Sequence, residues 1–161
     1  MLEAEDFFAG SLANAQPLTL VLPKRTGKEH FLIGKVGEEI TAAFLDGSHP
    51  FHTMLCEGTT AWTGLLVPNV TIQVDPQSAF DPAMYDAPLG CMIRYEDKLA
   101  LHAKAEGSGF SGRTVLLDLY SGLSKGDGDQ RIAFRRWQVT IGAPDNCRIL
   151  FNMDLPDRTA R

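Results

Sequence analysis

Short runs of apolar and β-branched residues recur along the whole chain, with turn-forming residues between them. The clearest example spans Arg131 to Leu155, where two such runs flank the segment GAPDN. This pattern predicts a long antiparallel hairpin, because glycine, proline, asparagine and aspartate favour tight turns. On the return strand Ile149, Phe151 and Met153 occupy alternate positions, so they are expected to share one face.

The remaining runs predict a mainly β protein of roughly nine or ten short strands, since runs of this length bounded by turn signals are typical of strands. Such a pattern favours an antiparallel β-sandwich or β-barrel. No alternation of strands with helices is visible, which excludes a doubly wound parallel sheet. The length of 161 residues suits one domain. We therefore expect a single β domain over residues 1–161, with a frayed tail at residues 156–161.

Residues 1–16 are predicted to hold a short helix and a linker. Leu2, Phe8 and Leu12 recur at roughly helical spacing, and Phe7 widens the apolar face. A helix this short is not stable alone in water. We expect it to lie on the β domain or on a partner subunit, which makes Phe7, Phe8 and Leu12 candidate interface residues.

The outgoing strand of the hairpin carries two adjacent arginines, Arg135 and Arg136, followed by Trp137. The apolar positions before the pair, Ile132 and Phe134, have one parity, and those from Trp137 onward have the other. A β-bulge at the arginine pair would let both sets face the core. Bulges often occur at barrel rims or near functional sites, so this region is a candidate ligand site.

Two interpretations of the arginine pair remain open. A guanidinium can bind a carboxylate or a phosphate of a ligand through two parallel hydrogen bonds. It can equally form an ion pair across the sheet, with Asp118 or Asp154 as the expected partner. The role of Trp62 also has two interpretations: it is either a core residue or a stacking residue in a pocket or interface.

His49, His52 and Cys56 have side chains that zinc accepts as ligands. On a straight strand, however, His52 and Cys56 would lie about 13 Å apart, too far to share one ion. A fourth ligand is not near in sequence. We interpret them as two turn histidines and a buried thiol, and predict neither a metal nor a cofactor. No sequence motif indicates a catalytic site, and the sequence leaves open whether the protein is an enzyme.

The charge and the cysteine content of the chain bear on its binding partners and on its location in the cell. The net charge is −5, which argues against nucleic acid or an anionic membrane surface as a partner. Three widely spaced cysteines do not indicate a disulfide framework. The chain has no apolar run long enough to span a membrane, and its first residues are acidic, unlike a signal peptide. We therefore expect a cytoplasmic protein.

The leading hypothesis is a non-catalytic domain that binds a protein partner or self-associates, most simply as a homodimer. The alternative is a small-molecule or flavin-binding β-barrel. There, the arginine pair or Lys24, Arg25 and Lys28 would hold a phosphate, and Trp62 or Trp137 would stack on a ring. A carbohydrate-binding sandwich is the third class, and it is disfavoured because most aromatic residues lie in runs that are expected to be buried.

Overall fold

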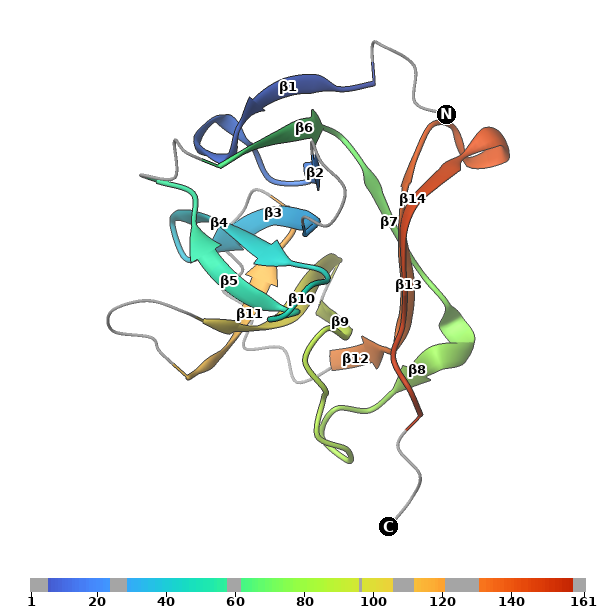
Figure 1. Ribbon diagram of the computed structural model, residues 1–161. Coiled ribbons are helices and arrows are strands. Elements are labelled where there is room, and N and C mark those ends of the chain that lie inside the picture. The colour runs from blue at the N-terminus through green and yellow to red at the C-terminus, as the bar shows by residue number, and fades with distance from the viewer. Residues whose placement is uncertain are drawn as a thin grey trace.

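A computed structural model describes residues 6–23, 29–57, 62–95, 97–105, 112–120 and 131–157 (Figure 1). Within these ranges the protein is mainly β. The strands are β1 (Phe8–Ser11), β2 (Leu20–Pro23), β3 (Phe31–Val36), β4 (Glu39–Phe44), β5 (His52–Leu55), β6 (Thr63–Val67), β7 (Thr71–Val74), β8 (Ala79–Phe80), β9 (Met92–Tyr95), β10 (Lys98–Ala105), β11 (Thr114–Asp118), β12 (Arg131–Phe134), β13 (Arg136–Ile141) and β14 (Arg148–Asp154). Three short 3-10 helices join them: η1 (Leu12–Asn14), η2 (Pro76–Ser78) and η3 (Pro144–Asn146). No helix within the described ranges is long and apolar enough to cross a membrane.

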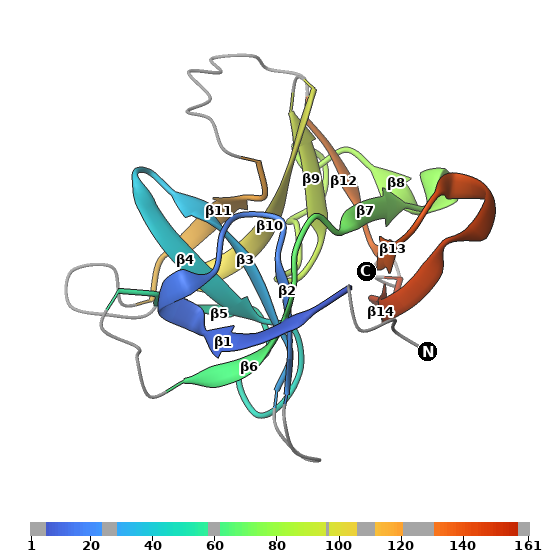
Figure 2. The same ribbon diagram turned by 90° about the horizontal axis from the view of Figure 1, so that it is seen from above.

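Five strands close into a barrel, which decides between the two predicted architectures. β3 pairs with β4, β4 with β5, β5 with β10 and β10 with β11. β11 then returns to β3 through the pair Lys35 and Asp118. The β5–β10 pair is parallel, whereas the sequence predicted only antiparallel neighbours. β2, β6 and β1 extend the sheet from one side of the barrel, and β9, β12 and β8 extend it from another (Figure 2).

β14, β13 and β7 form a separate three-stranded sheet beside the barrel (Figure 1). The largest hydrophobic core joins the two sheets. It includes Trp137 and Val139 from β13 together with Leu101 and Leu117 from the barrel strands, all buried. Burial of these large apolar side chains is the main force that holds the small sheet on the barrel.

The predicted N-terminal helix is wrong over the described residues. Phe8–Ser11 forms β1, which pairs antiparallel with β6, and only the single turn η1 follows it. The open edge of β6 offers backbone partners that a short isolated helix cannot match in stability. Gly10, inside the predicted helix, lies opposite Gly64 in this pairing. The first five residues lie outside the described ranges.

The C-terminal hairpin is confirmed, because β13 and β14 pair antiparallel along their length. The sequence predicted a β-bulge at the arginine pair, but the irregularity there is not a bulge. At Arg135 the chain leaves the barrel sheet, where β12 pairs with β9 and β8, and enters the three-stranded sheet as β13. The change of parity therefore marks a change of sheet. Ile132 is exposed and does not join the core, contrary to the prediction.

The bulge in this hairpin lies instead on the return strand. Val139 pairs with Phe151 and Thr140 with Ile149, so Leu150 is the extra residue between two successive pairs. Leu150 packs against the main core, whereas Ile149 is exposed. Ile149 therefore does not share the face of Phe151 and Met153, contrary to the prediction.

Candidate functional site

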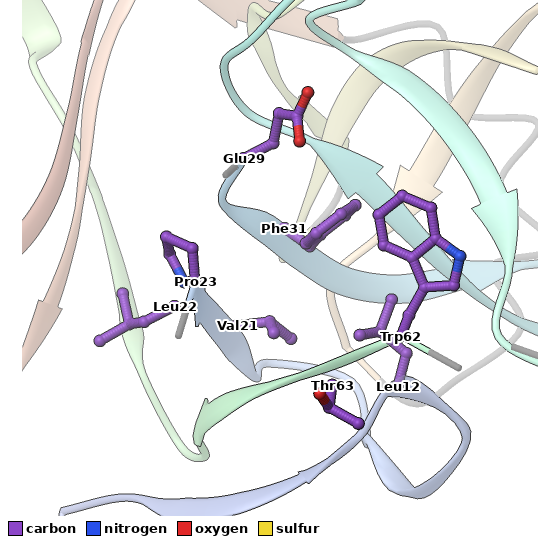
Figure 3. A pocket seen from close by; sticks show the side chains of 8 residues that line it. All are labelled: Leu12, Val21, Leu22, Pro23, Glu29, Phe31, Trp62 and Thr63. Atoms are coloured by element: carbon purple, nitrogen blue, oxygen red, sulfur yellow. The ribbon is translucent and has the colours of Figure 1, made fainter. Parts of the chain in front are cut away.

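An apolar pocket opens where β2, β3 and β6 lie side by side. β2 pairs with β6 on one edge and with β3 on the other, so the three strands form a continuous floor. The 3-10 turn η1 covers one end, held by the Leu12 backbone N–H, which donates to the Trp62 carbonyl oxygen at 3.0 Å. The cavity volume is about 160 Å³. Its lining residues are Leu12, Val21, Leu22, Pro23, Glu29, Phe31, Trp62 and Thr63 (Figure 3). We call it the Trp62 pocket.

Trp62 stands at the edge of this pocket rather than in the core. Its side chain is 42% exposed, although its ring makes edge-to-face contacts with Phe31 and Phe44. The ring centroids lie 5.6 Å from Phe31 and 6.3 Å from Phe44. Such contacts fix the orientation of the indole and are favourable in themselves. The result is a positioned aromatic surface that still faces solvent.

Among the described residues that line the pocket, Glu29 is the one that carries a charge. No described residue forms a hydrogen bond or an ion pair with its carboxylate. Its side chain lies over Gly47, which adopts a left-handed conformation with φ +87°. A Cβ atom at position 47 would overlap the Glu29 Cγ atom, so the glycine makes room for this side chain. Apart from Thr63, the other described residues that line the pocket are hydrophobic.

The arginine pair lies elsewhere, at the three-stranded sheet. Arg136 Nε donates a hydrogen bond to the Asp75 carboxylate at 2.8 Å. The Gln77 backbone N–H and the Arg136 guanidinium hold the pKa of Asp75 below its ordinary value. The same ion pair raises the pKa of Arg136. Arg136 thus forms an ion pair within the chain with Asp75, while Asp154, one of the two expected partners, lies opposite it on β14 and also raises its pKa.

Arg135 is also held by contacts within the chain. Its guanidinium carbon lies 4.4 Å from the centroid of the Phe80 ring, and its Nη1 donates to the Asp157 carboxylate at 3.2 Å. Its Nε is buried and has no hydrogen-bond partner. Asp118, an expected partner of the arginine pair, instead accepts hydrogen bonds from the Tyr95 hydroxyl and the Tyr120 backbone N–H.

A second pocket of about 310 Å³ lies beside Arg136 on the small sheet. Its polar side chains form cross-strand rows, with Gln138 Nε2 donating to Gln73 Oε1 at 2.6 Å. Trp137 borders it but is only 2% exposed, and its Nε1 donates to the Gly90 carbonyl oxygen at 2.8 Å. Trp137 is therefore a core residue. The candidate ligand residues divide into two separate pockets, with Trp62 in one and Arg136 and Trp137 at the other.

The histidine and cysteine candidates are not gathered into a metal site. The His49 and His52 rings contact each other, with centroids 5.4 Å apart. Cys56 is buried, and burial raises its pKa to about 11. No group of three histidine, cysteine, aspartate or glutamate residues within the described ranges is placed to hold a metal ion.

The three candidate interface residues do not form one surface. Leu12 is fully buried and lines the Trp62 pocket, Phe7 packs against the main core, and only Phe8 is largely exposed. Lys24, Arg25 and Lys28, the other phosphate candidates, lie outside the described residues.

Sequence reasoning missed Glu29 and Phe31 as site residues. Phe31 belongs to an apolar run that indicates a core strand, and Glu29 is an ordinary carboxylate next to a turn. Each lies about thirty positions from Trp62 along the chain, so only the pairing of β2 with both β3 and β6 brings them together. A solvent-facing tryptophan next to threonine residues was the available signal.

The fold and the pocket define a β-barrel protein with a small apolar surface site. By sequence, the chain belongs to the family described as "Uncharacterised protein y4lG", whose model matches residues 9–161. A protein of Sinorhizobium fredii (strain NBRC 101917 / NGR234), described as "Uncharacterized protein y4lG", is 37% identical over 163 residues, which cover 100% of this chain and 98% of the relative. No solved structure matches the chain at a significant level.

Proposed function

We propose that this protein is a non-catalytic binding module that takes an apolar side chain of a protein partner into the Trp62 pocket. The observation that carries the proposal is the exposed indole of Trp62, held by Phe31 and Phe44 at the edge of an apolar cavity. Tryptophan is enriched among the residues that dominate the energy of protein interfaces, especially beside pockets that a partner side chain fills.

The size of the pocket favours a side chain over a whole small molecule. A cavity of about 150 Å³ accommodates one benzene ring, whereas sites for drug-sized ligands span roughly 300–1,000 Å³. The Trp62 pocket, at about 160 Å³, therefore has room for one ring or one branched aliphatic group. A flavin or a nucleotide would need much more space, which is why the small-molecule alternative has less support.

The chemistry of the lining points the same way. Within the described part of the chain, only Glu29 and Thr63 among the lining residues are not hydrophobic. Apolar walls release water when an apolar group enters, and this release supplies affinity without any chemical step. The pocket is therefore suited to holding an apolar group.

Selection of a random peptide library on the immobilised wild-type protein tests this proposal. We expect the selected peptides to share one large apolar or aromatic residue. We also expect their binding to shift the indole NMR signal of Trp62, while that of the buried Trp137 stays in place. Peptides that bind without moving the Trp62 signal would contradict the proposal.

The partner can also be a second copy of this chain, as the predicted homodimer requires. Native mass spectrometry of the wild type and of Trp62→Ala separates the two cases. A wild-type dimer that Trp62→Ala converts to a monomer would place a second copy at the pocket. A monomer, or a dimer that Trp62→Ala leaves intact, would assign the pocket to a different partner.

A further inference from the structure

We infer that the partner carries a positive charge next to the apolar side chain that enters the Trp62 pocket, as a lysine or arginine beside that side chain in the partner's segment would supply. This inference rests on the proposed function, and it specifies the chemistry of the occupant. Its first support is Glu29, a carboxylate residue in the lining of a pocket whose other described side chains are hydrophobic apart from Thr63.

The carboxylate of Glu29 distinguishes between classes of occupant. A partner without a positive charge beside its apolar side chain would displace water from the carboxylate without replacing its hydrogen bonds, which is unfavourable. An anionic group would add direct repulsion. A cationic group replaces the lost water contacts with a charge-assisted hydrogen bond. No described residue already fills this role for Glu29.

The aromatic side of the pocket favours the same class. The Phe31 and Trp62 rings stand nearly perpendicular, at 86°, and Trp62 keeps an exposed surface. The face of a tryptophan ring attracts cations more strongly than that of any other side chain. Long basic side chains also lay their methylene stems on apolar surface while the charged end stays near water or a carboxylate. In Figure 3, Glu29 and Trp62 border different sides of the pocket, as these two contacts require.

The Glu29 side chain packs closely over the backbone of Gly47. Gly47, in its left-handed conformation, leaves the space over which the Glu29 side chain lies. The overall charge of −5 adds a weaker, long-range attraction for basic partners.

Two small probes of nearly equal shape test the inference: benzylammonium, which is cationic at pH 7, and benzyl alcohol, which is neutral. Both are titrated into protein with ¹⁵N-labelled tryptophan, and binding is read from the indole signal of Trp62. The buried Trp137 provides an internal control. We expect dissociation constants in the millimolar range, with benzylammonium about threefold to tenfold tighter. This preference should shrink as salt is added.

Glu29→Gln is the decisive variant because it keeps the shape of the side chain and removes its charge. We expect the preference for benzylammonium to fall to about twofold or less, with benzyl alcohol unaffected. Glu38→Gln, which alters an exposed carboxylate in the turn between β3 and β4, is the matched control and should leave the preference intact.

The outcomes separate this inference from the function on which it rests. If neither probe moves the Trp62 signal, the pocket does not bind ring-sized groups, and both the inference and the proposed function fail. If both probes bind equally to the wild type, or if Glu29→Gln leaves the preference unchanged, only the inference of a cationic occupant fails.

Discussion

Two tryptophans illustrate how far single residues can be understood from the sequence. Trp62 and Trp137 both lie near β-branched residues in predicted strands, yet one is 42% exposed and the other 2%. The difference comes from what covers each side chain. The Gly90 carbonyl oxygen accepts the hydrogen bond of Trp137, 47 positions away, whereas the described ring contacts of Trp62 are those with Phe31 and Phe44. Such coverage depends on long-range contacts that no local pattern encodes.

The buried cysteines give a prediction at the same scale. Burial raises the pKa of Cys56 from 9.0 to about 11 and that of Cys91 from 9.0 to about 12. The thiolate is the reactive form, so both thiols should resist alkylation at pH 8 in the folded protein. Mass spectrometry after iodoacetamide treatment should find them modified only in denaturant. Rapid modification of either one without denaturant would show that it is not buried.

The same pKa shifts link stability to pH. Because the folded-state pKa values are raised, the stability that the two neutral thiols contribute is complete below about pH 9 and is lost as pH rises toward 11–12. Between pH 8 and 10.5 the wild-type Tm should fall about 10 °C further than that of a Cys56→Ala/Cys91→Ala variant. Equal slopes for the two proteins would contradict this linkage.

At the scale of elements, the segment around Arg135 was partly predictable. The change of parity between Phe134 and Trp137 is visible in the sequence, and it locates the irregularity correctly. Its nature was not visible, because it depends on the strands that pair on each side. β12 pairs with β8 and β9 in the barrel sheet, whereas β13 pairs with β7 and β14 in the three-stranded sheet. In the N-terminal segment the local pattern itself was misleading. Its helical spacing predicted a helix, but Phe8–Ser11 pairs with the edge of β6 as a strand.

Deletion of Arg135 tests this junction. Shortening the connection by one residue should turn either the buried face of β12 or that of β13 outward, exposing Phe134 or Trp137. We expect a loss of more than about 4 kcal/mol of unfolding free energy, enough to abolish cooperative unfolding monitored by circular dichroism. Arg136→Ala, which keeps the backbone length, should melt within about 3 °C of the wild type. A deletion variant that melts like the wild type would contradict the assigned junction.

At the scale of the whole molecule, the class of fold was predictable and its closure was not. Regular turn signals indicated many short strands, but they do not specify which strands meet. The parallel pair of β5 and β10 joins His52 to Lys104, and β11 closes the ring on Lys35 of β3. These partners are separated by 52 and 83 positions. The Trp62 pocket also depends on such long-range pairings. Of its described lining residues, only Trp62 was identified from the sequence as a residue that could line a pocket.

Gly34 provides a test of barrel closure. A Cβ atom there would overlap the Asp118 carbonyl oxygen and lie 2.8 Å from Leu117 Cγ, so the closing strands β3 and β11 would be forced apart. Gly34→Ala should therefore cost about 1–3 kcal/mol in urea unfolding. Gly37→Asn is the control, because that left-handed position has open space around it and asparagine tolerates the conformation. Equal stability of Gly34→Ala and the wild type would show that the barrel does not close there.

The most direct test of the binding proposal is the affinity of one library-selected peptide for three proteins, measured by isothermal titration calorimetry. These are the wild type, Trp62→Ala, and Ile149→Ala, which alters an exposed apolar residue on the other sheet. We predict that Trp62→Ala weakens binding about tenfold or more, while Ile149→Ala stays within about twofold of the wild type. If Trp62→Ala, with its fold intact by circular dichroism, binds the peptide as tightly as the wild type, the Trp62 pocket is not the binding site.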